Sequence, residues 1–294
     1  DCKVECLAPT NKAARLIGGK TLDSVNYQCI VDQKKLVKWA QELHYLIVDE
    51  ISMVHEKFYR LLTNIKKINP KIIFFICGDF EQLKPVNDDW NGDYENSPVL
   101  KDICNNNKLV LTECKRSDDT LFNLCQNVQS IDITRFRPTH QTYLNIAFTH
   151  KTRIEVNNMY MELFLNDCHE EPIAIPKDDK NPKTQDLKLV KGMPIICHKT
   201  NKKLNILNSE RFEITKIDNE TITFTNDFKN EPIEVDVKDF HNFFYLAYCI
   251  TIHASQGDTF TSQYTIYDWE RMSKRAKYVA MSRGNNIGNI QIHQ

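Results

Sequence analysis

The pattern of apolar and polar positions predicts two kinds of structure along the chain. Over residues 1–130, continuous apolar runs such as VECLAP, YLIVDE and KIIFFICGD alternate with segments of helical period such as NKAARLI, HEKFYRLLTNIKKI and DTLFNLCQNV. Apolar runs without alternation are typical of strands buried on both faces, and such strands form parallel sheets that are covered by helices. This part of the chain is therefore predicted to be an α/β domain.

The pattern changes twice in the second part of the chain. Residues 131–186 are more polar, although LNIAFTHKTRIEVNNMYMELFL predicts a strand followed by a helix. Residues 187–245 carry short alternating strands, among them RFEITKID and ETITFTND, separated by Asn and Asp residues that favour turns. Strand–helix alternation returns over residues 246–294. We expect a second α/β domain made of 131–186 and 246–294, with a small β-barrel of 187–245 inserted into it.

Composition and charge narrow the class of protein. The 294 residues are 41% hydrophobic and 26% charged, as in ordinary globular proteins, and the net charge is −1. A nucleic-acid site would therefore have to be a local basic track. No apolar run approaches the roughly 18 residues that span a membrane, and no signal peptide is evident, so no membrane association is expected. The ten cysteines form no C-x-x-C pair and lie in apolar runs, which predicts reduced, buried thiols in an intracellular protein of the cytoplasm or nucleus.

The tripeptide Gly19-Lys20-Thr21 is how a phosphate-binding P-loop, G-x-x-x-x-G-K-[ST], ends. The first glycine of that pattern makes the tight turn that aims backbone N–H groups at phosphate, but Ala14 stands at its place. The preceding residues, NKAARLI, include good helix formers, and paired glycines commonly end a helix. The local pattern therefore favours a helix cap over a P-loop.

Two predicted strands end in polar residues that suit nucleotide chemistry. The strand YLIV runs into Asp49 and Glu50, and the strand IIFFIC runs into Gly78 and Asp79. Gln82 follows one turn later. Ligands bind at the carboxyl ends of parallel strands, where Asp49 could hold Mg²⁺ through water and Glu50 could act as a general base. Each segment taken alone also has an ordinary interpretation. Asp49 and Glu50 could be solvated acids at the end of a strand, and Gln82 could be a surface amide.

Three further segments carry groups that suit phosphate. YCITIHASQGDTF places hydroxyls, an imidazole and a glycine directly after a strand. LTECKRSDD contains Arg116, and YVAMSRGNN contains Arg283. Considered alone, each arginine is more often a surface charge than a catalytic group, and His253 is more often an ordinary core or loop histidine.

In order and spacing, these segments resemble the motifs of the superfamily 1 DNA helicases, in the group that contains RecD and the petite-integration-frequency (Pif-type) helicases. CLAPTNKAARLI with KTLDSV resembles motif Ia and its partner, LIVDEISMV motif II, and CGDFEQLKPV motif III. LTECKRSDD resembles motif IV, YCITIHASQGDTF motif V, and YVAMSRGNN motif VI. The resemblance covers nearly the whole chain. It implies two RecA-like P-loop NTPase lobes, of which the first lacks its P-loop because that motif would fall before Asp1.

The resemblance also implies roles for individual residues. Two lobes would clamp ATP, with Mg²⁺ held by Asp49 through water, Glu50 polarising the attacking water and Gln82 sensing the terminal phosphate. Arg116 and Arg283 would act as arginine fingers. The other implied nucleotide contacts are Asp79, Gln256, Gly257 and Asp258. The implied DNA contacts are Pro9, Thr10, Asn11, Ser24, Thr149, Lys151, Thr152, His198, Asn208, Thr251, His253 and Ser255.

This chain departs from the family pattern at two positions. Asp23 stands where the family usually has a histidine, and Ala254 stands where it often has a lysine. The second departure puts one phosphate contact in doubt, but not the strand-binding role of motif V.

The implied activity is that of an ATP-dependent helicase that translocates on single-stranded DNA and unwinds duplexes 5′→3′. Its partners would be single-stranded and duplex DNA, with replication, recombination and repair proteins as candidates, and the Asn, Lys and Ile content suggests an AT-rich viral source. We expect residues 1–294 to be part of a longer protein and to hydrolyse no ATP alone. A degenerate helicase segment that only binds single strands, and an RNA helicase of the same superfamily, stay open as alternatives.

Overall fold

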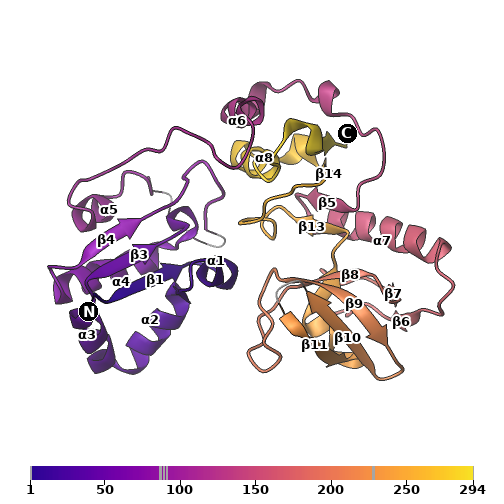
Figure 1. Ribbon diagram of the computed structural model, residues 1–294, viewed down its shortest axis with the longest axis horizontal. Coiled ribbons are helices and arrows are strands. Elements are labelled where there is room, and N and C mark those ends of the chain that lie inside the picture. The colour runs from indigo at the N-terminus through magenta and orange to yellow at the C-terminus, as the bar shows by residue number, and fades with distance from the viewer. Residues whose placement is uncertain (1, 86–87, 89, 91, 227–228, 294) are drawn as a thin grey trace. The chain divides into compact units, whose positions relative to one another are not determined.

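The computed structural model describes residues 2–85, 88, 90, 92–226 and 229–293. The chain divides into two compact units, Asp1–Glu113 (unit 1) and Cys114–Gln294 (unit 2). Each unit has a parallel sheet of its own (Figure 1). In the described part of the chain, no helix combines the length and the apolarity that a membrane crossing needs.

Unit 1 has the predicted α/β architecture. Its strands are β1 (Val4–Ala8), β2 (Lys20–Thr21), β3 (Tyr45–Val48) and β4 (Ile73–Ile76). They form one parallel sheet in the order β2-β1-β3-β4. The helices are α1 (Asn11–Leu16), α2 (Leu22–Val31), α3 (Gln33–Glu42), α4 (Glu56–Ile68) and α5 (Pro98–Ile103), with a 3₁₀ turn η1 (Ile51–Met53) after β3.

Helix α4 illustrates how the sequence pattern positions this unit. Phe58, Leu61, Leu62 and Ile65 recur at helical spacing and are buried together with Leu46 of β3. An apolar stripe of this kind packs a helix against a sheet and leaves its other face in solvent. Helix α4 thus covers one face of the sheet, and the acidic ends of β3 and β4 lie at its edge.

The paired glycines end a helix, as predicted. Helix α1 is capped at Ile17, and Gly18 follows with φ of +62°, the left-handed conformation that glycine adopts at a helix end. A methyl group on Gly19 would lie 2.2 Å from the carbonyl oxygen of Cys6, so only glycine allows the chain to pass β1 here. Lys20 then opens β2, and the P-loop interpretation of this segment is excluded.

One face of the sheet in unit 1 is less covered than the sequence predicts. The run IIFFIC suggests a strand buried on both sides, but Ile73 and Phe75 are 48% and 53% exposed, whereas Phe74 is buried. In the ladder Ile73 aligns with Tyr45, which aligns with Val4, and Val4 is 50% exposed. The exposed apolar residues therefore share one face of β1, β3 and β4.

Unit 2 contains a second parallel sheet. Its strands are β5 (Leu144–Ala147), β13 (Cys249–Thr251), β14 (Tyr264–Tyr267) and β15 (Ile290–Ile292), in the order β13-β5-β14-β15. The helices are α6 (Asp119–Gln126), α7 (His150–Asn166) and α8 (Lys274–Met281). The short 3₁₀ segments are η2 (Val128–Ser130), η3 (Ile133–Phe136), η4 (Val237–Asn242), η5 (Trp269–Arg271) and η6 (Ile287–Asn289).

The predicted insert of residues 187–245 is present as antiparallel structure. Strands β8 (Pro194–Cys197), β9 (Arg211–Ile217), β10 (Thr221–Asn226), β11 (Lys229–Asp236) and β12 (Phe244–Leu246) form a sheet in the order β11-β10-β9-β8-β12. Strand β7 (Leu187–Leu189) pairs instead with β6 (Ile173–Ile175). In the described residues no ladder joins β11 to β12, so closure of this sheet into a barrel stays a prediction.

The boundary between the units lies at Glu113/Cys114, whereas the sequence placed it at residue 130. Asp118 precedes α6 and is bound to the segment after α8. Its N–H donates to the Asn285 carbonyl at 3.2 Å, and its Oδ2 accepts from the Ile287 N–H at 3.1 Å. These contacts join residues 114–130, with Arg116, to unit 2.

Candidate functional site

The carboxyl end of β3 carries the two predicted acids of unit 1. The Asp49 N–H donates to the Leu7 carbonyl at 2.9 Å, and Asp49 Oδ1 accepts from the Glu50 N–H at 2.9 Å. Glu50 has φ of +53° and ψ of +44°, a left-handed conformation that is uncommon for a residue with a side chain. Such strain, of order 1–3 kcal/mol, collects at functional sites where the surrounding structure enforces it.

The loop after β4 is held directly against the Asp49–Glu50 loop. The Cys77 N–H donates to the Val48 carbonyl at 2.8 Å, and the Ile51 N–H donates to the Cys77 carbonyl at 2.9 Å. A methyl group on Gly78 would lie 2.8 Å from both Cγ2 and N of Ile51, so glycine is required for this approach. Desolvation and the negative charge of Asp49 raise the pKa of the Cys77 thiol, which places the two groups close together.

Asp79 and Gln82 complete the acidic edge of unit 1. Asp79 accepts from the Glu81 N–H at 3.0 Å, and the Gln82 side chain donates Nε2–H to Asp79 Oδ2 at 3.4 Å. The other amide atom, Gln82 Oε1, is buried and has no hydrogen-bond partner in the described part of the chain. A buried carbonyl oxygen without a donor costs about 1–3 kcal/mol, so this oxygen is a candidate acceptor for a ligand. The structure therefore gathers Asp49, Glu50, Asp79 and Gln82 at one sheet edge.

The residues of this edge fit a magnesium ion held through water. Mg²⁺ in phosphate-transfer sites keeps several waters and needs only one or two protein carboxylates. Asp49 is half-buried, and among the described residues the only hydrogen bond of its carboxylate uses Oδ1. No group of three or more His, Cys, Asp or Glu side chains, of the kind that would enclose a metal fully, occurs in the described residues.

The predicted DNA residues of unit 1 are partly engaged in local structure. Thr10 caps α1 by accepting the Ala13 N–H at 3.1 Å, and Asn11 begins that helix after Pro9. The Ser24 hydroxyl donates to the Thr21 carbonyl at 2.7 Å. A capping hydroxyl still has its own proton to donate, whereas the Ser24 proton is already used.

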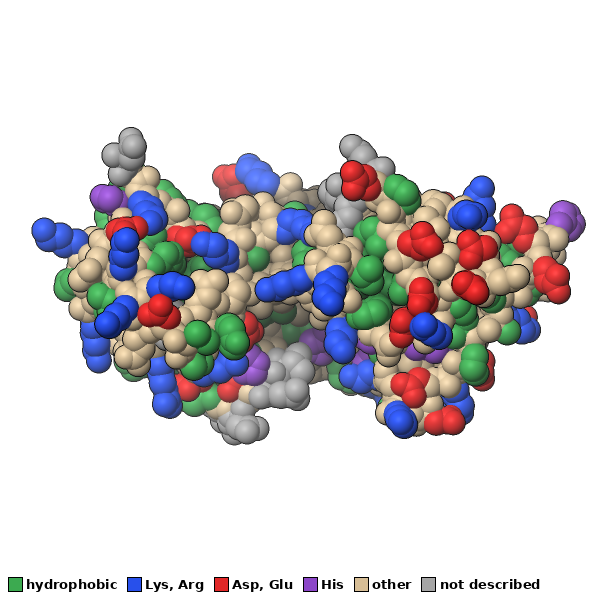
Figure 2. Space-filling view, turned by 90° about the horizontal axis from the view of Figure 1, so that it is seen from below, with side chains coloured by type: hydrophobic (Ala, Val, Ile, Leu, Met, Phe, Trp, Pro, Cys, Tyr) green, Lys and Arg blue, Asp and Glu red, His purple; other side chains and the backbone are tan. Residues whose placement is uncertain are grey.

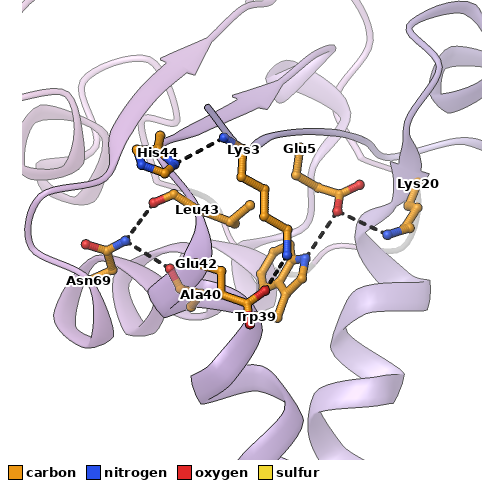
Figure 3. A network of polar contacts seen from close by, with 9 residues as sticks. All are labelled: Lys3, Glu5, Lys20, Trp39, Ala40, Glu42, Leu43, His44 and Asn69. Carbon is orange, nitrogen blue, oxygen red and sulfur yellow. Dashed lines mark hydrogen bonds and ion pairs between the residues drawn. The ribbon is translucent and has the colours of Figure 1, made fainter. Parts of the chain in front are cut away.

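The groove between α2, α3 and the start of β1 is basic but internally neutralised. It has a volume of about 340 Å³ and is lined by Lys3, Lys20, Lys35, Lys38 and Trp39, among others. Figure 2 shows Lys and Arg side chains gathered on the α2–α3 side of unit 1. Figure 3 shows that Lys3 pairs with Glu42, while Glu5 accepts from both Lys20 and Trp39. This network holds α3 to β1 and neutralises two of the four lysines of the groove, Lys3 and Lys20.

In unit 2 the loop after β13 is a tight turn. Thr251 Oγ1 accepts the Ala254 N–H at 3.3 Å, Gly257 has φ of +79°, and the His253 ring is exposed. Ser255 is fully buried, and its hydroxyl donates to the Ile252 carbonyl at 2.8 Å. The Ser255 hydroxyl therefore stabilises the turn, and the role of Ser255 as a DNA contact stays a prediction.

Gln256 is the second amide that lacks partners. It is 8% exposed, and neither its Nε2 nor its Oε1 has a hydrogen-bond partner among the residues the structure describes. Asp258, two residues later, pairs with Arg211 of the antiparallel insert at 3.4 Å. The insert is thus fixed to the turn that carries the predicted nucleotide contacts Gln256, Gly257 and Asp258.

The two predicted arginine fingers have different environments. Arg116 is exposed. Arg283 is 1% exposed and donates to the carbonyls of Val279, Ser255 and Asp258 at 3.1–3.4 Å. Arg283 therefore ties α8 to the turn after β13 within unit 2, a positional role that was not predicted from the sequence.

The N-terminus of α7 is organised by an acid that the sequence reading missed. Asp268 accepts from the Thr149 N–H and hydroxyl at 3.0 and 3.1 Å, and from the Thr152 hydroxyl at 2.8 Å. Asp268 has φ of +63°, directly after β14. Lys151, between the two threonines, is exposed and lies 3.9 Å from Glu155. An acid after a strand was the only available signal, as for Glu50 after β3.

The two predicted DNA contacts of the insert, His198 and Asn208, lie in different environments. The His198 ring stacks on Tyr245 with centroids 4.0 Å apart and planes 10° apart, and its Nε2 lies 3.0 Å from the His241 carbonyl oxygen. Burial lowers the pKa of His198, so the ring is neutral at pH 7. Asn208 is exposed, and its N–H donates to Thr200 Oγ1.

Comparison with known proteins supports the helicase resemblance at the level of the fold. The family model of the AAA domain matches residues 2–88. No curated protein matches the chain in sequence. The Bacteroides Pif1 helicase in complex with ADP-AlF3 and single-stranded DNA is 20% identical, with a TM-score of 0.66 over 99% of this chain and 82% of that chain.

Two further solved structures agree. The Pif1 helicase from Candida albicans is 20% identical, with a TM-score of 0.68 over 98% of this chain and 84% of that chain. A structure of two coordinating Pif1 helicases that unwind forked double-stranded DNA is 19% identical, with a TM-score of 0.69 over 99% of this chain and 81% of that chain. The predicted fold of two RecA-like lobes is therefore confirmed.

Proposed function

We propose that this chain is the motor of a Pif1-type superfamily 1 DNA helicase, which uses ATP hydrolysis to translocate on single-stranded DNA. The observation that carries the proposal is the acidic edge of unit 1, where Asp49 and Glu50 end β3 and Asp79 binds Gln82, whose buried Oε1 has no donor in the described part of the chain. The order of the helicase-like segments and the fold shared with Pif1 helicases support it.

Each residue of the acidic edge has a role that its geometry allows. Asp49 would hold Mg²⁺ through water, and the bound ion would supply neutralisation of phosphate charge. Glu50 accepts a proton from the attacking water, and Gln82 Oε1 accepts the other proton of that water and so orients it. Arg116 and Arg283 are proposed to stabilise the charge of the transferred phosphoryl group, an effect worth on the order of 10³–10⁵ in rate in other nucleotide hydrolases.

DNA binding is proposed to use the residues after β1 and β5 and those of the β13 turn. The candidates are Pro9, Thr10, Asn11, Ser24, Thr149, Lys151, Thr152, Thr251, His253 and Ser255, and the insert adds His198 and Asn208. Of these, Lys151, His253 and Asn208 are exposed. Contacts to phosphates and sugars carry no base preference, so binding should tolerate any sequence. We propose 5′→3′ unwinding, which a duplex with a 5′ tail and one with a 3′ tail distinguish; unwinding of the 3′-tailed duplex alone would contradict this polarity.

The decisive experiment measures ATP hydrolysis by the natural protein with and without single-stranded DNA. Wild type should hydrolyse ATP faster with DNA, whereas Glu50→Gln should bind the same oligonucleotide and lose hydrolysis at least 100-fold, as expected for loss of a general base. Glu81→Gln, in the same region, is the control and should keep activity. Full activity of Glu50→Gln would refute the assigned chemistry.

A second candidate is a single-strand-binding module that does not hydrolyse ATP. It is favoured by one observation, namely that the segment most like a P-loop, Gly19-Lys20-Thr21, passes close to β1 and forms strand β2 instead of a phosphate-binding loop. DNA binding by a protein in which neither wild type nor Glu50→Gln turns over ATP would support this candidate. Equal binding and stimulation by RNA and DNA oligonucleotides would instead support the RNA helicase alternative.

A further inference from the structure

Unit 2 contains a buried arginine without a counter-ion. Arg153 of α7 is 2% exposed, and its guanidinium carbon lies 4.4 Å from the centre of the Tyr245 ring. Its Nη2 donates to the Lys183 carbonyl, and its Nη1 is buried without a hydrogen-bond partner in the described residues. No described carboxylate lies within ion-pair distance of Arg153. The region around it therefore has an uncompensated positive charge.

The Nε–H group of Arg153 fixes the tautomer of a neighbouring histidine, His150. Arg153 Nε lies 3.2 Å from Nδ1 of His150. An arginine cannot accept a hydrogen bond, so Nδ1 of His150 must be the acceptor and carries no proton. The ring proton then resides on Nε2, on the opposite side of the ring.

His150 stays neutral under ordinary conditions. Burial, followed by the charges of Arg153 and Lys183 and the neighbouring His253 and His198, lowers the pKa of His150 to about 4. At pH 7 the ring is therefore an uncharged donor with a single fixed N–H. Because the ring is only half-buried, part of it remains open to solvent.

The position of His150 suits a nucleic-acid ligand. It is the first residue of α7, between Thr149 and Lys151, and the exposed Lys151 adds a positive charge. Asp268 already accepts from the Thr149 N–H and from the hydroxyls of Thr149 and Thr152, so these three donors are not free to hold an anion. The unbalanced charge of Arg153 favours an anion at the His150 ring.

We propose that His150 is a further DNA contact, which donates Nε2–H to a phosphate oxygen of the single strand, and that Arg153 is the positioning residue that fixes this tautomer. The proposal rests on the proposed function in one respect, since it takes DNA as the ligand. The tautomer itself does not depend on that function and can be tested separately.

Long-range ¹H–¹⁵N spectra of protein labelled at histidine report the tautomer of each ring. The resonance that is lost in His150→Ala should show at pH 7 a bare Nδ1 and a protonated Nε2. Arg153→Met keeps the length of the side chain and removes a buried unpaired charge, so it should fold, and in it the His150 ring should become a mixture of tautomers. A mixture, or a doubly protonated ring, in the wild type would overturn the proposal.

DNA binding tests the second half of the proposal. Fluorescence anisotropy with an oligothymidine at several salt concentrations gives both affinity and salt slope. His150→Ala should weaken binding roughly 5- to 10-fold, as expected for one lost hydrogen bond, without changing the slope, because no charge is lost. Lys151→Ala should reduce the slope by about 0.7, the value for one phosphate contact on a single strand. His169→Ala, an exposed histidine beyond the far end of α7, should bind as wild type.

The outcomes separate this inference from the proposed function. Wild-type affinity in His150→Ala together with a reduced slope in Lys151→Ala would overturn the inference alone. Wild-type behaviour in both variants would remove this end of α7 from the DNA site and overturn the inference with it. A reduced slope in His150→Ala would show that the ring is charged and would also overturn it. Thermal unfolding of each variant checks that it is folded.

Discussion

At the scale of single residues, the predicted nucleotide positions contain buried atoms that lack partners. Gln82 Oε1 and both amide atoms of Gln256 are without hydrogen bonds in the described part of the chain. Buried polar atoms in folded proteins are nearly always paired, and each exception costs about 1–3 kcal/mol. Both glutamines belong to segments that resemble helicase motifs. The free-energy cost of their unpaired amide atoms therefore arises at positions where a bound ligand would supply the missing partners.

Replacing Gln256 with methionine should therefore raise stability while lowering activity. Methionine has a similar volume and leaves no polar atom unpaired, so we expect the free energy of unfolding to increase by about 1–2 kcal/mol. DNA-stimulated ATP hydrolysis by the natural protein should fall. Chemical denaturation and a hydrolysis assay measure the two effects. Gln126→Met, on the exposed end of α6, is the matched control and should change neither quantity. Lower stability in Gln256→Met would show that the amide has partners in the folded protein.

At the scale of secondary-structure elements, helix α4 depends on a residue that is distant in sequence. His55, the residue before α4, makes no capping hydrogen bond through its side chain. Asp88 supplies this contact, since its Oδ2 accepts from the Glu56 N–H at 2.9 Å and from the Tyr94 hydroxyl. Burial alone would raise the pKa of Asp88, but the Tyr94 hydroxyl, the N–H groups of Glu56 and Trp90 and the charge of His55 together lower it.

This contact predicts a pH-dependent contribution to stability. A lowered pKa in the folded state means that the contribution is complete above the usual aspartate pKa of about 3.9 and is lost as pH falls through the folded value. Asp88→Asn should reduce the free energy of unfolding by about 1 kcal/mol at pH 7, because hydrogen bonds to a charged carboxylate are stronger than those to a neutral amide. The difference from wild type should shrink below about pH 3.9. Urea unfolding at several pH values measures it, with the exposed Asp102→Asn as control. A difference that is constant with pH would contradict the assignment.

The exposed sheet face of unit 1 gives a second prediction at this scale. Val4, Ile73 and Phe75 share that face. Leu109 and Leu111, which follow α5 in the sequence, are also exposed. Exposed apolar strand residues promote association between chains. Ile73→Thr with Phe75→Thr should reduce self-association of the chain in analytical ultracentrifugation, with little change in melting temperature. The same double change at the buried neighbours of the opposite face, Phe74→Thr with Leu46→Thr, should instead unfold unit 1.

The sequence predicted those features that depend on local pattern. The strands before Asp49 and Asp79, the helix end at Gly18 and the strand–helix pair around Thr149 all have periodicity, a turn residue or a cap within a few positions. It could not predict contacts between distant segments. Asp268 on Thr149, Asp118 on the segment after α8, and Asp88 on α4 each join residues that become neighbours only through the fold.

At the scale of the whole molecule, helicase-like segments from both ends of the chain are built into two units with separate parallel sheets. Each unit has an acid in a left-handed conformation within two residues of the end of a parallel strand, Glu50 after β3 and Asp268 after β14. Each also has a threonine that caps a helix after a strand, Thr10 after β1 and Thr149 after β5. This repetition of local structure is what two lobes of one architecture would produce, and it is visible only once the strands are assigned.

Arg283 decides between a catalytic and a structural reading of the last helicase-like segment. Its guanidinium donates to three backbone carbonyls that lie on α8 and on the turn after β13. Arg283→Ala leaves these carbonyls without their donor in a buried site, so unit 2 should lose about 2–4 kcal/mol of stability, in addition to any loss of ATP hydrolysis. Hydrogen exchange measured by mass spectrometry resolves the two units: protection should fall in α8 and in residues 251–258, while β1 and β3 should be unaffected. Unchanged protection together with lost hydrolysis would show that Arg283 acts on the nucleotide alone.

Arg116→Ala, which removes an exposed side chain, should leave protection unchanged and lower hydrolysis, because its proposed role does not involve the packing of unit 2.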